Sequence, residues 1–423
     1  MSAPDTPDHV HSSVDHLFRH RAGQMVASLT RIFGLQHIDL VEDAVQDALV
    51  RALRLWPYEG TPRNPTAWLI QVAKNRLLDR LRRQSLWHQK QPEAERSMSA
   101  LREAAADSGP AFAREVRDDQ LRMIFTCCHP AIPRESQIAL TAKTVGGFST
   151  AEIARAFLCR EATIAQRLVR AKRKLKQRAV KLEMPQPEEL AKRLDPVLEV
   201  LYLMFNEGYS ALEGEDLVRT DLCHEAIRLV ELLAAHPAAV APRVHALAAL
   251  FFFQAARLPA RADAAGDLLL LDEQDRSVWD REMLRRGLRH LESSASGSQL
   301  SSYHLQAEIA ACHALATSLE STDWSRILSC YDDLLALDPS PVVALNRTVA
   351  LAKVEGPEAG LRALDELAED RSLRHYHPLY ATRGELLGQL RRTRESVACY
   401  RQALALNSSE PVRRFLEKKL NAN

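Results

Sequence analysis

The sequence predicts an all-α protein with several domains. Its 423 residues are too many for one ordinary hydrophobic core, and 46% of them are hydrophobic, as in globular chains. Apolar residues recur at three- and four-residue spacing, for example at Met25, Val26, Leu29, Ile32 and Phe33. No sustained run alternates Val, Ile, Thr or Tyr with polar residues, so the pattern does not favour strands.

The first helical segments lie within residues 13–83 and are interrupted by a loop. Apolar residues at helical spacing predict a helix that ends at Trp56, because Pro57 follows it. The stretch 56–65 holds three prolines and a glycine and is expected to be a loop. Another helix is expected over 65–83, with proline in its first turn.

A helix-turn-helix pattern lies further along the chain. Ser149 and Glu152 have the spacing of a capping box, and a short break at 158–161 leads to a second helix over 162–175. The apolar stripe of this second helix is expected to face inward and consists of Ile164, Leu168, Ala171 and Leu175.

Charge is unevenly distributed, although the net charge is only +1. Residues 1–183 carry a formal charge of +9 and residues 184–423 a charge of −8. Between Arg160 and Lys181 there are nine lysines and arginines and one acid, Glu161. A cationic surface on a helix-turn-helix predicts DNA binding, and the acidic half is expected to do a different task.

The second helix of this motif supplies the predicted contacts to duplex DNA. Thr163, Gln166 and Arg170 lie near its start and are candidates to reach base edges. For Arg167 two functions stay open, a contact to DNA and an ion pair with Glu152 that braces the motif. The residues better placed for phosphates are Arg160, Lys172, Arg173 and Lys174.

The helix over 65–83 and the loop before it form a second candidate DNA surface. This helix is rich in cations, whereas Asp39, Glu42, Asp43 and Asp47 load the preceding helix with charge that suits a basic protein partner. An aromatic ring and amide donors in the loop could hold an unstacked base, and the alternative is an ordinary surface loop. The loop candidates are Tyr58, Arg63 and Asn64, and the helix carries Lys74, Asn75, Arg76, Arg80, Arg82 and Arg83.

Several stretches resemble the sigma-70 family of RNA polymerase sigma factors. Asp39–Leu53 resembles the core-binding helix of region 2, Ala67–Arg83 the helix after its −10 recognition loop, and Phe148–Leu175 region 4. Their order, without a region 3 domain, is similar to that of the extracytoplasmic-function group. Leu203–Tyr209 and Pro341–Arg347 resemble a subgroup in which a tetratricopeptide-like extension follows region 4.

The resemblance implies a sigma factor, not an enzyme, that binds RNA polymerase core and promoter DNA. It implies that Asp43, Gln46 and Asp47 contact the β′ coiled coil, with the β flap as a further core contact. It also implies that region 4 reads the −35 element as duplex, while the loop 58–66 and its neighbours read and open the −10 element. The implied −10 residues are Tyr58, Arg63, Asn64, Lys74, Asn75, Asp79, Arg80 and Arg83.

The domain order follows from these motifs and from a weak internal repeat. Tyr331–Asp338 is similar to Tyr400–Asn407, and the 69 residues between their starts are about twice the tetratricopeptide period. We expect region 2 over 13–85, a linker over 86–115, region 4 over 116–182, a helical domain over 183–295 and tetratricopeptide-like repeats over 296–423.

The extension contains a polar cluster among apolar helices. It is either a buried ion-pair network that fixes helix packing or a pocket for a regulatory ligand or protein. Its members are Asn206, Glu207, Tyr209, Arg219, Asp221, Glu225 and Arg228. The acidic extension as a whole is expected to regulate the DNA-binding half.

No cofactor, metal or membrane segment is expected. The seven cysteines include no CxxC pair, which fits reduced thiols, and Cys127-Cys128-His129 lacks a second ligand pair. Residues 1–10 lack the apolar core of a signal peptide, and the longest apolar stretch, 246–256, is too short to span a bilayer. A cytoplasmic location is therefore expected.

Two other functional classes stay open from the residues alone. A stand-alone DNA-binding repressor or activator would account for the helix-turn-helix but not for the acidic helix over 39–53. A helical enzyme built around residues 203–228 would need an acid–base or metal arrangement that the sequence does not contain.

Overall fold

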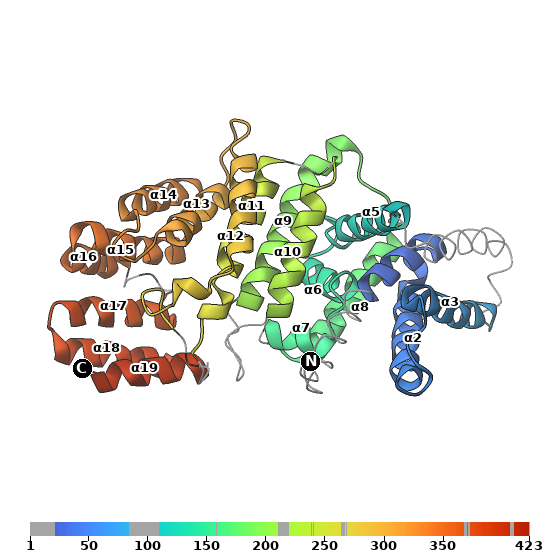
Figure 1. Ribbon diagram of the computed structural model, residues 1–423, viewed down its shortest axis with the longest axis horizontal. Helices are drawn as coiled ribbons and strands as arrows, with labels where there is room; N and C mark the ends of the chain where they lie inside the picture. The colour runs from blue at the N-terminus through green and yellow to red at the C-terminus, as the bar shows by residue number, and fades with distance from the viewer. Residues whose placement is uncertain are drawn as a thin grey trace, which may run out of the picture. The chain divides into compact units, whose positions relative to one another are not determined.

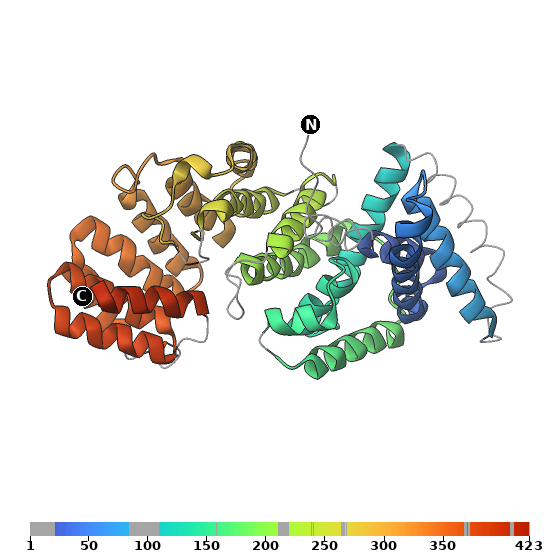
Figure 2. The ribbon, with the colours of Figure 1, turned by 60° about the horizontal axis from the view of Figure 1, so that its bottom comes forward.

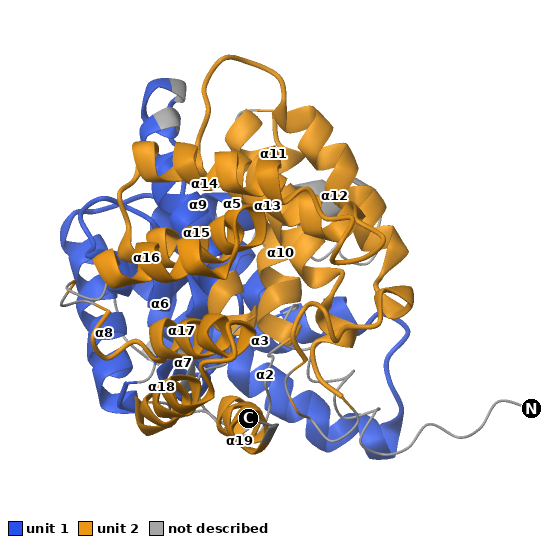
Figure 3. Cartoon of the chain, turned by 90° about the vertical axis from the view of Figure 1, so that its left-hand side faces the viewer, with its two compact units in different colours: residues 1–204 blue, residues 205–423 orange. Residues whose placement is uncertain are grey.

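Helices make up most of the structure, as the sequence predicts. No β-strand occurs among the residues described by this computed structural model (Figure 1). The chain forms two compact units, residues 1–204 and 205–423 (Figure 3). The described residues are 22–83, 110–157, 159–209, 220–237, 239, 241–263, 267, 269–367, 370, 373–406 and 410–422. Most of the expected linker, the turn residue Leu158 and Arg219 therefore lie outside them.

The first module of unit 1 contains a helix over residues 22–33, α2 (Ile38–Glu59) and α3 (Pro65–Arg83). The prediction that the α2 helix ends at Trp56 is wrong by three residues. Pro57 is accommodated inside α2, and the helix ends where Gly60 adopts a φ of 83° and its amide donates to the Trp56 carbonyl at 3.0 Å.

The second module of unit 1 is a set of four helices around a shared core. Figure 2 shows α7 and α8 as consecutive helices that meet at a short connection. The predicted capping box starts α7, because the Ser149 amide donates to the Glu152 carboxylate at 2.7 Å and the Glu152 amide donates to the Ser149 hydroxyl at 3.1 Å. The helices are α5 (Pro110–Cys127), α6 (Arg134–Thr144), α7 (Thr150–Ala156) and α8 (Glu161–Gln177).

The adjacent cysteines of α5 are part of this core. Cys127 and Cys128 are buried free thiols, and their sulfur atoms lie 3.1 Å from the Thr144 hydroxyl and 3.8 Å from the Thr141 hydroxyl, respectively. Burial raises the pKa of Cys128 to about 12, so this thiol stays protonated and behaves as a small hydrophobic group. No cluster of three metal-ligating side chains occurs in the described parts of the chain.

The helix α9 (Pro187–Tyr209) contributes residues to both units, since the division falls after Met204. Within unit 1, the Arg134 guanidinium pairs with Glu199 at 2.8 Å and donates to the Pro196 carbonyl at 3.2 Å. The first part of α9 is therefore fixed to the second module of unit 1.

Unit 2 begins with helices packed around a central apolar one. Phe251, Phe252 and Phe253 of α11 are fully buried, and α11 contacts α10, α12 and α13. On α12, a Cβ at Gly287 would lie 2.8 Å from the Phe253 ring, so the absence of a side chain permits this close packing. These helices are α10 (Thr220–Ala234), α11 (Pro242–Ala255) and α12 (Arg281–Ser294). No helix in the described ranges is both long and apolar enough to cross a membrane.

The rest of unit 2 consists of consecutive antiparallel helices, each packed on the next (Figure 1). The predicted repeat corresponds to real elements, because Tyr331 lies in α14 and Tyr400 in α18, helices that also begin 69 residues apart. The series comprises α13 (Ser302–Leu315), α14 (Trp324–Leu337), α15 (Pro341–Glu355), α16 (Pro357–Leu367), α17 (His377–Gln389), α18 (Thr393–Leu406) and α19 (Glu410–Ala422).

The stability of unit 2 is expected to fall in mild acid. Burial, aided by nearby cations, lowers the pKa of both His290 and His313 to about 4. The unfolded chain takes up protons near pH 6.5, so stability that is complete above that pH is lost as the pH falls towards 4, by roughly 2–3 kcal/mol for each histidine. Thermal unfolding of the full chain followed by circular dichroism at pH 7, 6, 5 and 4.5 measures this loss. A chain with His290→Gln and His313→Gln should show a much flatter profile, and an unchanged profile would contradict the assignment.

Candidate nucleic-acid interface

The second helix of the helix-turn-helix, α8, is strongly amphipathic. Ile164, Leu168, Ala171 and Leu175 are buried, as predicted, and α8 packs on α6 and α7. The opposite side of α8 is exposed and presents Gln166, Val169, Arg170, Arg173 and Lys174. This side carries a long, polar and cationic stripe, which is the arrangement needed to enter a major groove.

The predicted DNA-contacting residues of α8 do not all lie on this stripe. Arg160 is exposed at the N-cap position, while Thr163 and Arg167 are half-buried. Lys172 is buried, with 10% of its side chain exposed, and its ammonium lies 2.6 Å from the Glu42 carboxylate of α2. The structure thus places Lys172 in an intramolecular ion pair, because it follows the buried Leu168 by one helical turn.

Val169 is a residue of this surface that sequence reasoning missed. Its side chain is 64% exposed between Gln166 and Arg173 on the same side of α8. An exposed apolar group there is suited to contact the methyl group of thymine. The sequence could have indicated Val169, because it follows Gln166 by three residues and precedes Arg173 by four, so all three share one side of the helix.

In the first module, α3 holds the acidic residues of α2 in place. The Arg80 guanidinium bridges Asp43 at 2.7 Å and Asp47 at 3.2 Å, and Arg76 approaches Asp47 at 3.2 Å. Asp43 is nevertheless 64% exposed at its side chain, and Gln46 is exposed beside it. Arg80, predicted as a DNA contact, therefore also braces the predicted polymerase-contacting residues.

An exposed ring precedes the loop between α2 and α3, and a capping residue ends this loop. Tyr58 is 90% exposed on the last turn of α2, and Arg63 is exposed in the loop. The Asn64 side-chain oxygen accepts a hydrogen bond from the Ala67 amide at 3.0 Å and so caps α3. Asn64 thus has a structural function in addition to its predicted one. The side chain of Arg83 lies outside the described residues.

A polar cavity of about 530 Å³ lies between α2 and α3. It brings together three predicted residues, Asp47, Asn75 and Asp79, with the ring of Trp68. Trp68 is half-buried and packs edge-on against Trp56, with ring centroids 5.5 Å apart. Its walls also include Arg76, which the sequence analysis names, and two residues that sequence reasoning missed, Arg51 and Arg54. The i, i+4 and i+7 spacing of residues 47, 51 and 54 could have indicated them.

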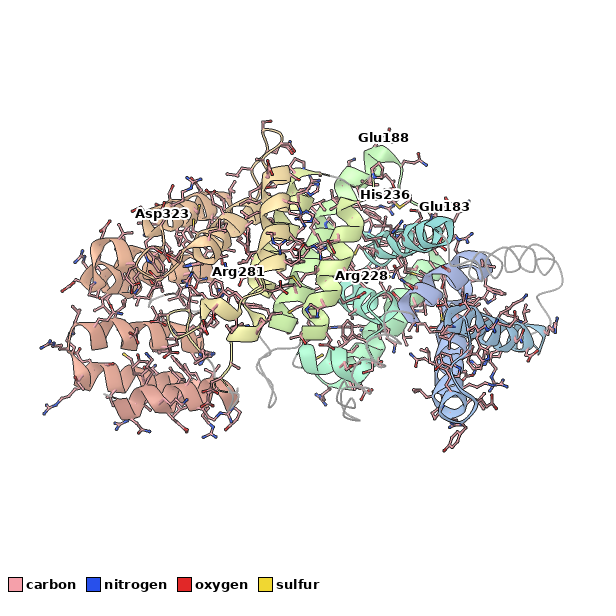
Figure 4. All side chains as sticks on the ribbon, in the orientation of Figure 1. Glu183, Glu188, Arg228, His236, Arg281 and Asp323 are labelled. Carbon is pink, nitrogen blue, oxygen red and sulfur yellow. The ribbon has the colours of Figure 1, made fainter. Side chains whose placement is uncertain are left out.

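The polar cluster of the extension forms specific internal contacts. Arg228 of α10, labelled in Figure 4, forms a bidentate pair with the buried Glu225, with N···O distances of 2.6 and 2.9 Å. The Arg261 guanidinium lies 3.9 Å from the centre of the Tyr209 ring. Burial raises the pKa of Glu207 to about 7. The Glu225–Arg228 pair favours the ion-pair interpretation for this part of the cluster.

Comparisons with known proteins find three families along the chain, in the same order as the regions predicted from the sequence. Residues 17–86 match the family Sigma-70 region 2, residues 122–175 match Sigma-70, region 4, and residues 193–295 match a family of unknown function, DUF6596. An uncharacterized protein of Rhizobium meliloti (strain 1021) is 42% identical over 391 residues, which cover 92% of this chain and 90% of that protein. No solved structure matches.

Proposed function

The chain belongs to the extracytoplasmic-function sigma factors of the sigma-70 family, with a C-terminal extension after region 4, and we propose which part of it binds core polymerase, which parts bind promoter DNA and which part regulates them. A sigma factor binds RNA polymerase core and directs promoter-specific initiation. Sigma factor families are non-enzymatic DNA-binding regulators, and polymerisation is catalysed by the core enzyme. The stand-alone repressor does not account for the match to region 2.

Region 4 recognises the −35 element through the exposed side of α8. The observation that carries this assignment is the separation of the buried stripe of α8 from the exposed polar stripe with Gln166, Arg170 and Arg173. Gln166 and Arg170 reach base edges, while Arg160, Arg173 and Lys174 contact phosphates. Thr163 and Arg167, half-buried on α8, border this contact surface.

Region 2 binds and opens the −10 element beside the polar cavity between α2 and α3. The exposed Tyr58 ring offers a stacking surface for an unpaired base, and Arg63 and Lys74 are placed to approach the backbone. Asn75 and Asp79 on the cavity wall supply donors and acceptors for a base edge. Asn64 and Arg80 support this surface through the α3 cap and the α2–α3 brace.

The core polymerase is bound through the acidic side of α2. Asp43 and Gln46 are exposed there, and the Asp47 carboxylate is held one helical turn further on. Their charge suits a basic surface of the β′ coiled coil. Transcription from a promoter library with reconstituted polymerase tests the whole assignment, since a sigma factor must yield transcripts that start at one promoter class and depend on this chain.

The domain limits follow the motifs, with region 2 over 13–85, a linker over 86–115, region 4 over 116–182, a helical domain over 183–295 and helical repeats over 296–423.

The extension from residue 183 onwards regulates regions 2 and 4. Its net negative charge supports a function other than DNA binding. A cavity of about 430 Å³ in the repeats could take a regulatory ligand or protein segment and is lined by Trp324, Val349, Lys353, Leu386 and Gln389, among others.

A chain that ends after Tyr209 is expected to change promoter activity severalfold compared with the full chain. The end is placed there because Arg134 contacts Pro196 and Glu199, so an earlier end would damage unit 1. Run-off transcription with equal amounts of core polymerase measures the change, roughly fivefold or more for a coupling of ordinary size. Equal activity of the two chains, with circular dichroism showing that the shorter one is folded, would exclude a regulatory extension.

A further inference from the structure

The cavity of about 430 Å³ in unit 2 has walls that come from segments far apart in the sequence. The loop 270–272 contributes one part, and α14, α15, α17 and α19 contribute most of the rest. The lining is largely apolar and includes Trp324, Val349, Leu386 and Phe415. A cavity of this size and character is suited to a small organic molecule.

The cavity wall is held together by ion pairs of the C-terminal helix. The Lys418 ammonium and the Arg414 guanidinium lie 2.6 and 2.7 Å from the two oxygens of Asp267, in the loop between α11 and α12. The Asp267 side chain is only 12% exposed, so its charge depends on these two cations. The next residue of α19, Lys419, pairs with Glu385 of α17 at 3.3 Å. Helix α19 is therefore fixed to two of the segments between which the cavity lies.

The acidic groups of the wall do not require a cation from a ligand. One oxygen of Glu385 accepts a hydrogen bond from the Tyr400 hydroxyl at 2.9 Å and pairs with Lys419, and the other accepts one from the Gln389 amide at 3.4 Å. Burial raises the pKa of Glu385, but these three neighbours more than offset this effect and lower it. Asp272 is exposed, and within the described residues it forms no hydrogen bond or ion pair, so it stays hydrated.

The wall also carries a cation, Lys353 of α15. It is exposed and forms no ion pair within the described parts of the chain, although the exposed Glu320 lies within range of its charge. Its ammonium lies 5.8 Å from the centre of the Trp324 ring, which keeps the charge beside the apolar lining. Asn346, two helical turns earlier on the same side of α15, adds an amide donor to the wall. An ammonium and an amide donor beside an apolar cavity can recognise a carboxylate that is attached to a hydrocarbon body.

We propose that this cavity binds a small organic carboxylate with an apolar body, of the kind represented by a medium-chain fatty acid. The carboxylate lies at Lys353 and Asn346, and the hydrocarbon body lies against Trp324, Leu386 and Phe415. The inference deepens the regulatory function proposed for the extension and rests on it for any effect on transcription. Such a ligand would contact both the loop 270–272, which lies within the match to DUF6596, and the repeats that follow, so its binding would stabilise their contact.

Binding is tested by isothermal titration calorimetry of the full chain with hexanoate, octanoate and decanoate. Each added methylene that is buried should raise the affinity about fourfold until the hydrocarbon body fills the cavity. Decanol has the same body without the charge and should bind roughly fivefold more weakly than decanoate. No binding of any of the three carboxylates, or equal affinities for decanoate and decanol, overturns the proposal.

The position of the carboxylate is tested by removing the cation. Lys353→Gln should bind decanoate and decanol with nearly equal affinity. Arg362→Gln is the matched control, because it removes the same charge from an exposed residue of the neighbouring α16 that does not line the cavity, and it should still prefer decanoate. A preference for decanoate that persists in Lys353→Gln contradicts the assigned position.

The position of the hydrocarbon body is tested by filling the cavity. Val349 lines the cavity and is 37% exposed, so Val349→Trp can be accommodated without disturbing the core and should abolish decanoate binding. Val354→Trp is the matched control, since Val354 lies on the same helix, is 42% exposed and does not line the cavity. With both variants shown by circular dichroism to be folded, equal affinities for decanoate would place the ligand elsewhere and refute the inference.

Run-off transcription distinguishes failure of the site from failure of the proposed function. Decanoate should change the transcript yield of the full chain by roughly fivefold and should leave that of Val349→Trp unchanged. Binding in calorimetry without any effect on transcription refutes the regulatory consequence. A chain that yields no promoter-specific transcripts refutes the proposed function, whereas the binding site is refuted by the calorimetric results alone.

Discussion

Replacing Asp43 and Asp47 together with arginine (Asp43→Arg, Asp47→Arg) is expected to weaken binding to RNA polymerase core by roughly 100-fold or more. Asp43 is exposed on α2 and Asp47 is partly exposed one turn further on, so a basic partner would meet both carboxylates and their reversal replaces attraction by repulsion. A titration of fluorescently labelled chain with core polymerase measures the loss. Glu59→Arg is the control, because it reverses one acidic charge at an exposed end of α2, away from the proposed contact, and should bind normally.

A second variant separates binding from folding. Asp43→Arg alone brings two guanidinium groups together, since Arg80 lies 2.7 Å from Asp43, and this could loosen α2 from α3. Arg80 also pairs with Asp47, so Arg80→Glu is added to the chain that carries both Asp43→Arg and Asp47→Arg, where it restores ion pairs of reversed polarity between the same helices. This triple variant should regain much of the lost thermal stability but not the affinity for core. Recovery of both would mean that the two aspartates act through the fold and do not contact the polymerase.

The combined change Arg170→Glu and Arg173→Glu is expected to abolish detectable run-off transcription from the cognate promoter. Both residues are exposed on the polar side of α8, and reversing two cations opposes two phosphate or base contacts with negative charge. Binding to core should persist, because the acidic side of α2 is unchanged. Arg178→Glu, exposed beyond the end of α8, is the matched control and should reduce transcription much less.

A milder change on the same helix tests sequence readout. Gln166→Ala should cost about 1–3 kcal/mol at one base pair of the −35 element and relax the preference there, without changing the salt dependence of binding. Arg173→Ala should instead weaken binding to all sequences and reduce the salt slope by about one unit. If the two variants had the same profile, the division into base and phosphate contacts on α8 would be wrong.

The sequence predicted the elements better than their contacts. Helical periodicity and the capping box at Ser149 and Glu152 depend on neighbours three and four residues apart, so α7 and the buried stripe of α8 could be predicted locally. The end of α2 could not, because a proline near a helix end is tolerated when the turn that follows, here at Gly60, supplies the stop. The repeat helices were found only through the similarity between α14 and α18.

The pairing of charges was the least predictable part of the candidate site. Lys172 belongs to a run of cations whose local pattern is that of a phosphate-binding surface. Its partners, Asp39 and Glu42, lie 133 and 130 residues away, and only the tertiary structure brings them within reach. The double contact of Arg80 to α2 was hidden for the same reason, since its partners are 37 and 33 residues away.

The close packing at Gly287 has a consequence for the relatives of this chain. A Cβ atom there would lie 2.8 Å from the Phe253 ring, so a residue larger than glycine fits only if position 253 carries a smaller side chain. The two positions are therefore expected to change together among related chains, and a comparison of their sequences tests this expectation.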